Sequence, residues 1–165
     1  MSFFLSLLLL QAGSVMAADT PPYAVPGEDA VDPYVADNRN AGASPFDGEG
    51  MAMAFHGQEG IGRIVENMID ASSADSVIGE IFANQDKVRL KRTIFEQFCY
   101  ILNAGCSYTG RDMAASHKDL GIQKADMNRL VEVLQRAMTA EGVAFQAQNR
   151  FLSKLAPMRR DVLQK

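Results

Sequence analysis

The apolar residues between Met51 and Leu163 recur with the spacing of α-helices. Because an α-helix turns once every 3.6 residues, apolar side chains three and four positions apart share one face. This period predicts helices over residues 59–71, 86–102, 112–120, 125–141 and 145–163, and a short turn from Asp75 to Phe82. Glycines after the middle segments are typical helix stops, and Pro157 is expected to kink the last helix. The alternation typical of strands is missing, so the sequence predicts an all-α fold.

The first residues of the chain have a different pattern. An apolar run from Phe3 to Leu10 precedes several small residues, which is typical of a secretory signal peptide, although the usual basic residues before the run are missing. The run is too short to cross a bilayer, which needs roughly 20 apolar residues. We expect a signal peptide over residues 1–17, removed after Ala17 or Ala18, and a secreted or periplasmic protein without stable membrane insertion. A misassigned start or an uncleaved apolar tail is the alternative.

Residues 18–50 are rich in Pro, Gly, Asp and Asn and contain seven acidic residues against Arg39 alone. Such a segment buries too little apolar surface to offset the entropy lost on ordering, so we expect a flexible acidic arm. A solvated spacer is favoured over a peptide that docks on a partner. The predicted folded domain, residues 51–165, then holds 13 acidic and 15 basic residues. The whole chain has a net charge of -4, which argues against a general nucleic-acid-binding protein.

Most sequence patterns of catalytic and cofactor sites are missing. The chain has no P-loop, dinucleotide fingerprint, nucleophile elbow or C-x-x-C-H haem-attachment motif, and its two histidines and two cysteines lack zinc-site spacing. Cys99 and Cys106 lie seven residues apart across a predicted helix end. They are able to form a disulfide in an oxidising compartment or to remain two separate buried thiols, and the sequence leaves both open.

The stretch "YTGRDMAASHKDLGI", Tyr108 to Ile122, draws attention to His117. This histidine lies on the predicted short helix, one turn after Met113, so an imidazole and a thioether share one face. On another predicted helix, Leu90, Ile94 and Phe98 form an uncharged stripe. An imidazole that faces apolar surface offers haem iron a nitrogen ligand and walls that exclude water. A structural or exposed histidine is the alternative.

Together with "FANQDKVRLKRTIFEQF" and "LAPMRRDVL", this stretch resembles the group 1 truncated haemoglobins, which are two-over-two helical globins, over about residues 55–163. The resemblance implies non-covalent haem b, with His117 as the iron ligand and Phe82 as the aromatic residue against the haem. The further residues expected to line the haem are Met113, Leu90, Ile94, Phe98, Ile69, Ile122, Met127 and Leu130.

Basic residues are expected near the haem carboxylates, because long cationic side chains can lie along apolar surface with the charge at its rim. Arg89 and Arg92 on the predicted long helix are the main candidates, with Lys91 and Arg111 as further ones. A solvated helix face is the alternative for each of them.

The sequence departs from the family on the side where a gas would bind. The family commonly has a tyrosine at the position of Ile69, and its hydroxyl holds bound oxygen. The polar residue that often assists this tyrosine corresponds to Ile94, and the residue that faces the gas one turn earlier corresponds to Leu90. The family's paired glycines appear as His56-Gly57 and Ala104-Gly105, so one glycine survives at each turn.

These departures bear on function, because oxygen chemistry needs acid, base and hydrogen-bonding groups. They favour a globin that reversibly binds a diatomic gas (oxygen, carbon monoxide or nitric oxide) over a haem enzyme such as a nitric-oxide dioxygenase or a peroxidase-like detoxifier. A haem-free helical interaction module is the third alternative. The sequence identifies no reductase partner.

Overall fold

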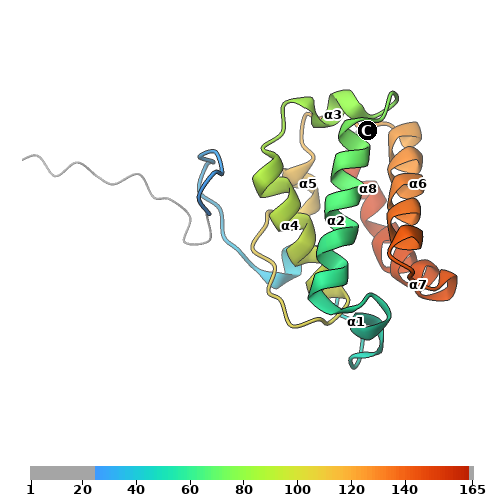
Figure 1. The fold of residues 1–165 in the computed structure, drawn as a ribbon. Coiled ribbons are helices and arrows are strands. Elements are labelled where there is room, and N and C mark those ends of the chain that lie inside the picture. The colour runs from blue at the N-terminus through green and yellow to red at the C-terminus, as the bar shows by residue number, and fades with distance from the viewer. Residues whose placement is uncertain (1–24, 164–165) are drawn as a thin grey trace, which may run out of the picture.

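The computed structural model describes residues 25–163, and its regular elements are all helical (Figure 1). In chain order they are η1 (Asn38–Ala41), α1 (Gly50–Ala54), α2 (Gly57–Ser73), α3 (Gly79–Ala83), α4 (Lys87–Ile101), α5 (Met113–Ser116), α6 (Lys124–Ala140), α7 (Phe145–Leu155), η2 (Ala156–Met158) and α8 (Arg159–Val162). The all-α prediction is confirmed. The predicted signal peptide lies outside the described residues. Between residues 25 and 163, no helix is long and apolar enough to cross a bilayer.

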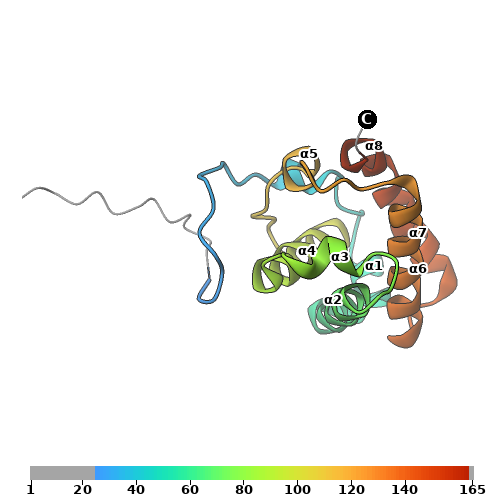
Figure 2. The ribbon, with the colours of Figure 1, turned by 90° about the horizontal axis from the view of Figure 1, so that it is seen from above.

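The four longest helices form two pairs, α2 with α4 and α6 with α7, and α2 packs against both α4 and α6. In Figure 1, α2 stands between α4 and α6, and Figure 2 shows α4 beside α2 on one side and α6 with α7 on the other. The predicted apolar face of α2 is the reason, because Ile61, Ile64, Val65, Met68 and Ile69 are all buried in the core. Fully burying one such side chain contributes about 1.5–3 kcal/mol. This arrangement is that of a two-over-two globin.

Three aromatic rings fix how the two pairs meet. The ring of Phe151 on α7 packs edge-to-face against Phe98 on α4, with 4.9 Å between the centroids, and against Phe55, with 5.2 Å. Edge-to-face pairs contribute beyond the area that they bury, because the positive edge of one ring meets the negative face of the other. After α7 the chain passes through η2, which contains Pro157, so the predicted kink is confirmed.

Left-handed backbone conformations occur where the family has paired glycines. His56 has φ 59° and Gly57 has φ 66°, just before α2 begins. A histidine rarely takes this conformation, and here its Nδ1 atom lies 3.0 Å from the carboxylate of Glu141. Near this turn, a side chain on Gly60 would collide with the carbonyl oxygen of Phe55. The turn thus depends on Gly57 and Gly60, and tolerates His56.

The segment before α1 differs from its prediction. Ala41 is fully buried, the Phe46 backbone N–H donates to the carbonyl of Ile101 at 2.8 Å, and the Tyr34 hydroxyl donates to the carbonyl of Thr109 at 2.9 Å. For residues 25–50, the structure corrects the prediction of a flexible arm. The contacts come from single side chains and backbone groups at irregular spacing, which a search for apolar periodicity does not detect.

A disulfide joins Cys99 and Cys106, whose Cα atoms lie 5.5 Å apart. The structure thereby decides between the two alternatives that the sequence left open. The bond ties the end of α4 to the loop that leads towards α5. By closing a loop in the unfolded chain, such a bond stabilises the fold by roughly 2–3 kcal/mol.

Asp75 joins the loop between α2 and α3 to α6. One carboxylate oxygen accepts from the backbone N–H groups of Val77 at 2.9 Å and Ile78 at 3.3 Å. The other oxygen pairs with the Arg129 guanidinium, 2.9 Å from Nε and 2.8 Å from Nη2. The hydrogen bond from Arg129, together with those from the backbone, lowers the pKa of Asp75 from 3.8 to about 2.

We predict that Asp75→Asn lowers the melting temperature at neutral pH. Since the folded pKa lies below the unfolded one, the contribution of the carboxylate is fully present above pH 3.8 and is lost as the pH falls through 2. Calorimetry across that range should show the melting temperatures of wild type and variant converging. Glu132→Gln removes the other carboxylate partner of Arg129, 2.7 Å away, and should have a smaller effect. A difference independent of pH would contradict the prediction.

Candidate functional site

The short helix α5 holds the histidine singled out by the sequence. Asp112 caps this helix, because its side chain accepts from the backbone N–H of Ala115 at 2.8 Å. The helix covers Met113 to Ser116 and ends at His117, so it is shorter than the predicted 112–120. Asp119 and Gly121 take left-handed conformations after it, with φ 62° and 68°. His117 therefore lies at the end of this helix, as its C-terminal cap.

The His117 ring has one nitrogen committed and one available. Nδ1 lies 2.7 Å from the carbonyl oxygen of Met113, which only accepts hydrogen bonds, so Nδ1 carries the proton and Nε2 keeps its lone pair. Burial lowers the pKa of His117, and the bond to Met113 opposes this only in part. The ring is thus neutral at neutral pH. A neutral imidazole anchored through Nδ1 is the usual form of a histidine metal ligand.

The predicted haem-lining residues belong to the hydrophobic core cluster of the protein or pack against it. The predicted haem-lining residues that are buried in this cluster are Ile69, Phe82, Phe98, Met113 and Ile122. Those that are half-buried and pack against it are Leu90, Ile94, Met127 and Leu130. These four keep apolar surface that a flat apolar ring would cover, which is favourable by about 25 cal/mol per Å². The apolar character of these residues therefore suits a haem.

The face of α4 that carries Leu90 and Ile94 is poor in free hydrogen-bond donors. The Thr93 hydroxyl donates to the Arg89 carbonyl at 2.9 Å, within the helix itself. The Gln97 amide is buried and donates to the Ala41 carbonyl at 2.9 Å, with the Met113 sulfur 3.4 Å away. Both groups are committed to the protein.

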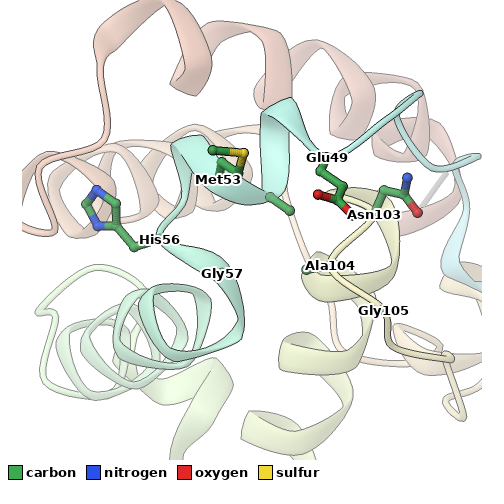
Figure 3. Close-up of a pocket in the computed structure, with 8 residues that line it drawn as sticks. Glu49, Met53, His56, Gly57, Asn103, Ala104 and Gly105 are labelled. Atoms are coloured by element: carbon green, nitrogen blue, oxygen red, sulfur yellow. The ribbon is translucent and has the colours of Figure 1, made fainter.

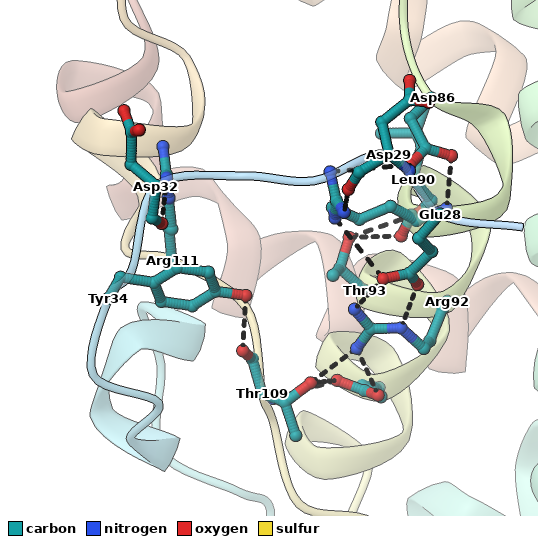
Figure 4. A network of polar contacts seen from close by, with 12 residues as sticks. Glu28, Asp29, Asp32, Tyr34, Asp86, Leu90, Arg92, Thr93, Thr109 and Arg111 are labelled. Atoms are coloured by element: carbon teal, nitrogen blue, oxygen red, sulfur yellow. Dashed lines mark hydrogen bonds and ion pairs between the residues drawn. The ribbon is translucent and has the colours of Figure 1, made fainter. Parts of the chain in front are cut away.

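The basic residues predicted at the haem carboxylates have protein partners instead. Arg89 and Arg92 pair with Glu28, and Arg111 donates to the Asp32 carbonyl (Figure 4). Lys91 lies 2.8 Å from the carboxylate of Asp70 on α2. The structure thus places the carboxylate of Glu28, from the segment before α1, against the guanidinium groups of Arg89 and Arg92, and their predicted contact with the haem carboxylates stays a prediction.

The structure also has a surface hollow of about 710 Å³ (Figure 3). Its walls come from α1, the start of α2 and the residues after α4, and include Met53, His56 and Asn103. The hollow contains none of the predicted site residues. His56, the second histidine of the chain, has its Nδ1 atom paired with Glu141. The His56 side chain is 48% exposed, so the hollow lacks the water-excluding apolar walls that a haem ligand needs.

Comparison with known proteins matches this geometry. A sequence model of the family described as bacterial-like globin covers residues 54–164. The group 1 truncated haemoglobin GlbN of Nostoc commune is 24% identical over 109 residues, which are 66% of this chain and 92% of that protein. The chain belongs to the bacterial-like globins, as a group 1 truncated haemoglobin. GlbN of Mycolicibacterium paratuberculosis is 29% identical, over 62% of this truncated globin and 75% of its own length.

Solved structures share the fold of this truncated globin. The truncated haemoglobin of Tetrahymena pyriformis in its Fe(III) form has a TM-score of 0.66 at 20% identity and covers 70% of this chain and 98% of its own. The two-over-two haemoglobin of Synechococcus sp. PCC 7002, solved in the cyanomet state with covalently attached haem, has a TM-score of 0.64 at 21% identity, with the same coverage. At this identity the likeness concerns the fold.

Sequence reasoning named apolar residues that lie in the core of this truncated globin or pack against it, but missed the polar contacts near α4. Glu28 is nearly fully buried against Arg89 and Arg92, although the sequence placed it in a solvated arm. The available signal was charge, because an almost purely acidic segment precedes a helix that carries three basic residues within four positions. Charge alone does not say which acidic residue meets which basic one.

Proposed function

We propose that this truncated globin holds haem b non-covalently through Nε2 of His117 and reversibly binds a diatomic gas at the iron. The observation that carries the proposal is the geometry of His117, whose Nδ1 is anchored on the Met113 carbonyl and whose pKa is lowered by burial. Both effects keep a neutral imidazole ready for a metal. The family of the chain supports the same cofactor.

Each group of side chains has a part in this function. The Met113 carbonyl holds the proton of His117 on Nδ1 and fixes the direction of the ring. Leu90 and Ile94 on α4, with Ile69 on α2, exclude water from the gas-binding side. When bound, the haem supplies the iron at which the gas binds.

The same observations weigh against the other functions. A nitric-oxide dioxygenase or peroxidase-like enzyme requires groups that donate hydrogen bonds and move protons, and Thr93 and Gln97 are committed to protein carbonyls. A haem-free interaction module would need neither an anchored neutral imidazole nor half-buried apolar residues on α4 and α6. Gas binding is therefore the function that we propose.

We further propose that the protein works outside the cytoplasm. The disulfide between Cys99 and Cys106 supports this proposal, because such bonds persist in oxidising compartments. Protein isolated from its native host should begin at Ala18 or Asp19 and should contain no free thiol. Mass spectrometry of the N-terminal peptide and of the alkylated cysteines measures both. A retained Met1 together with two alkylated cysteines would contradict the proposal.

We predict that His117→Ala abolishes haem retention, because it removes the metal-binding nitrogen. After reconstitution with haem and gel filtration, the wild type should keep a Soret band and one haem per chain, and the variant should lose both. Its helix content by circular dichroism should remain close to that of the wild type without haem, since α5 is only one turn long.

The second histidine provides the control for this experiment. His56→Asn changes a histidine outside the apolar cluster, and asparagine tolerates the left-handed backbone found there. This variant should keep its haem. If His117→Ala binds haem with unchanged stoichiometry and spectrum, His117 is not the ligand.

We predict rapid release of oxygen from the wild type. Oxygen at haem iron is stabilised by a hydrogen-bond donor, and the aliphatic side chains of Ile69, Leu90 and Ile94 have none. A hydrogen bond to a charged partner contributes roughly 1.5–3 kcal/mol, so Ile69→Tyr should slow oxygen release by about one to two orders of magnitude. Stopped-flow mixing measures the rate, and release of carbon monoxide should change much less.

Ile69→Phe is the matched control, because it adds the same ring without the hydroxyl. Ile69 is fully buried, so both variants disturb the packing in a similar way, and only the tyrosine adds a donor. Equal oxygen release from the two variants, or a wild type already as slow as Ile69→Tyr, would refute the prediction.

A further inference from the structure

Residues 28–40, here called the strap, cross from α4 to the loop before α5. Figure 4 shows the strap beside Arg92 at one end and beside Arg111 at the other, and Figure 2 shows this segment running from the α4 side of the molecule to α5. The haem site proposed above uses both of these elements, because Leu90 and Ile94 lie on α4 and His117 ends α5. The strap therefore connects the two sides of that site.

Glu28 anchors the strap on α4. Its carboxylate makes two bonds with Arg92, 2.5 Å from Nε to Oε1 and 3.0 Å from Nη2 to Oε2, and lies 3.5 Å from Nε of Arg89. The Glu28 side chain is only 1% exposed. Beside it, the Asp29 backbone N–H donates to the carboxylate of Asp86 at 2.8 Å, and Arg89 donates to the Asp29 carbonyl. Two-point pairing of this kind fixes direction as well as distance.

The other end of the strap is tied to the loop before α5. Tyr34 donates to the Thr109 carbonyl, and the Arg111 guanidinium lies 5.0 Å from the centre of the Tyr34 ring. Further along, the Asn38 side chain accepts from the Tyr108 backbone N–H at 2.7 Å. These contacts hold the strap to the same loop that the disulfide ties to α4.

Arg92 connects α4, the strap and the loop before α5. Besides Glu28, it donates through Nη1 to Glu96 at 2.9 Å and to the Thr109 hydroxyl at 2.6 Å. Burial by itself lowers the pKa of Arg92, but the hydrogen bonds to Glu28 and Glu96 outweigh it and raise the pKa, so the charge is permanent. Four of the five N–H groups of Arg92 are thus bonded to protein acceptors.

We propose that the strap is a clamp that retains the haem: it holds α4 and the loop before α5 at a fixed separation and closes that edge of the site. In this proposal Arg89 and Arg92 anchor the strap and do not bind the haem carboxylates. The proposal rests on the haem function proposed above. A signal peptide removed after Ala17 or Ala18 would leave the strap in the mature chain.

Loss of haem to an excess of an apoglobin acceptor tests the clamp. Glu28→Gln leaves two guanidinium groups without their shared charge partner, and haem loss should become on the order of tenfold faster. Asp29→Asn makes the same change of charge one residue away. The Asp29 side chain is exposed, and among the described residues only its backbone groups have partners, so this variant should lose haem at the wild-type rate.

The other end of the strap provides a second variant. Tyr34→Phe removes the hydroxyl that bonds to Thr109 and should also speed haem loss. In the double variant with Glu28→Gln, the rate of haem loss should rise by less than the product of the two single increases, since release of either end already loosens the clamp. Slower haem loss from Glu28→Gln would mean that Glu28 competes with the haem carboxylates for the arginines, and would overturn the proposal. An unchanged rate would overturn it as well.

Hydrogen exchange on the haem-free protein separates this proposal from the one on which it rests. The backbone N–H groups of Asp29 and Tyr108 are bonded across the strap contacts and should exchange faster in Glu28→Gln than in Asp29→Asn. Unchanged exchange would show that Glu28 does not anchor the strap. If the wild type binds no haem, the haem function fails, and the exchange result still decides whether the anchor exists.

Discussion

The apolar face of α2 packs against α4 on one side and α6 on the other, and the rest of the fold is arranged around these two contacts. Ile61 and Ile69 near the ends of this face are both fully buried, so the helix is held along its length. Because close-packed helices leave little freedom to shift, the position of α2 also fixes α4 and the residues that it carries. One wall of the proposed haem site is thus set by ordinary core packing.

The helix α5, on the opposite side of the proposed haem site, is held by polar and covalent contacts. A helix of one turn is not stable alone, so α5 takes its position from its surroundings. The cap by Asp112, the disulfide of Cys106 and the bonds at Thr109 all act on α5 or on the loop before it. His117 is then aimed by a single hydrogen bond to Met113. The iron ligand that we propose is therefore positioned by polar and covalent contacts more than by apolar burial.

The acidic residues before α1 and the basic residues of α4 belong to one arrangement. Considered separately, they suggest a solvated spacer and a rim for the haem carboxylates. In the structure, the carboxylate of Glu28, whose side chain is 1% exposed, lies against both arginines, whose side chains are 19% and 14% exposed. Removing one member of such a group is costly, because the remaining charges stay buried without a partner. For this reason the strap matters to the proposed site although it contributes no haem-lining residue.

The sequence by itself determined the long helices, the globin family and the identity of the candidate iron ligand, but not the short helix α1 or the early end of α5. Helix ends and faces follow from neighbouring residues, such as the cap at Asp86 and the apolar period of α2, so local patterns suffice. Only the tertiary structure decided that Cys99 pairs with Cys106 and that the Gln97 amide donates to the Ala41 carbonyl. It also decided that Arg92 pairs with Glu28, 64 residues away along the chain. A contact between two single side chains so far apart leaves no periodic trace in the sequence, because it depends on where the packed helices bring them.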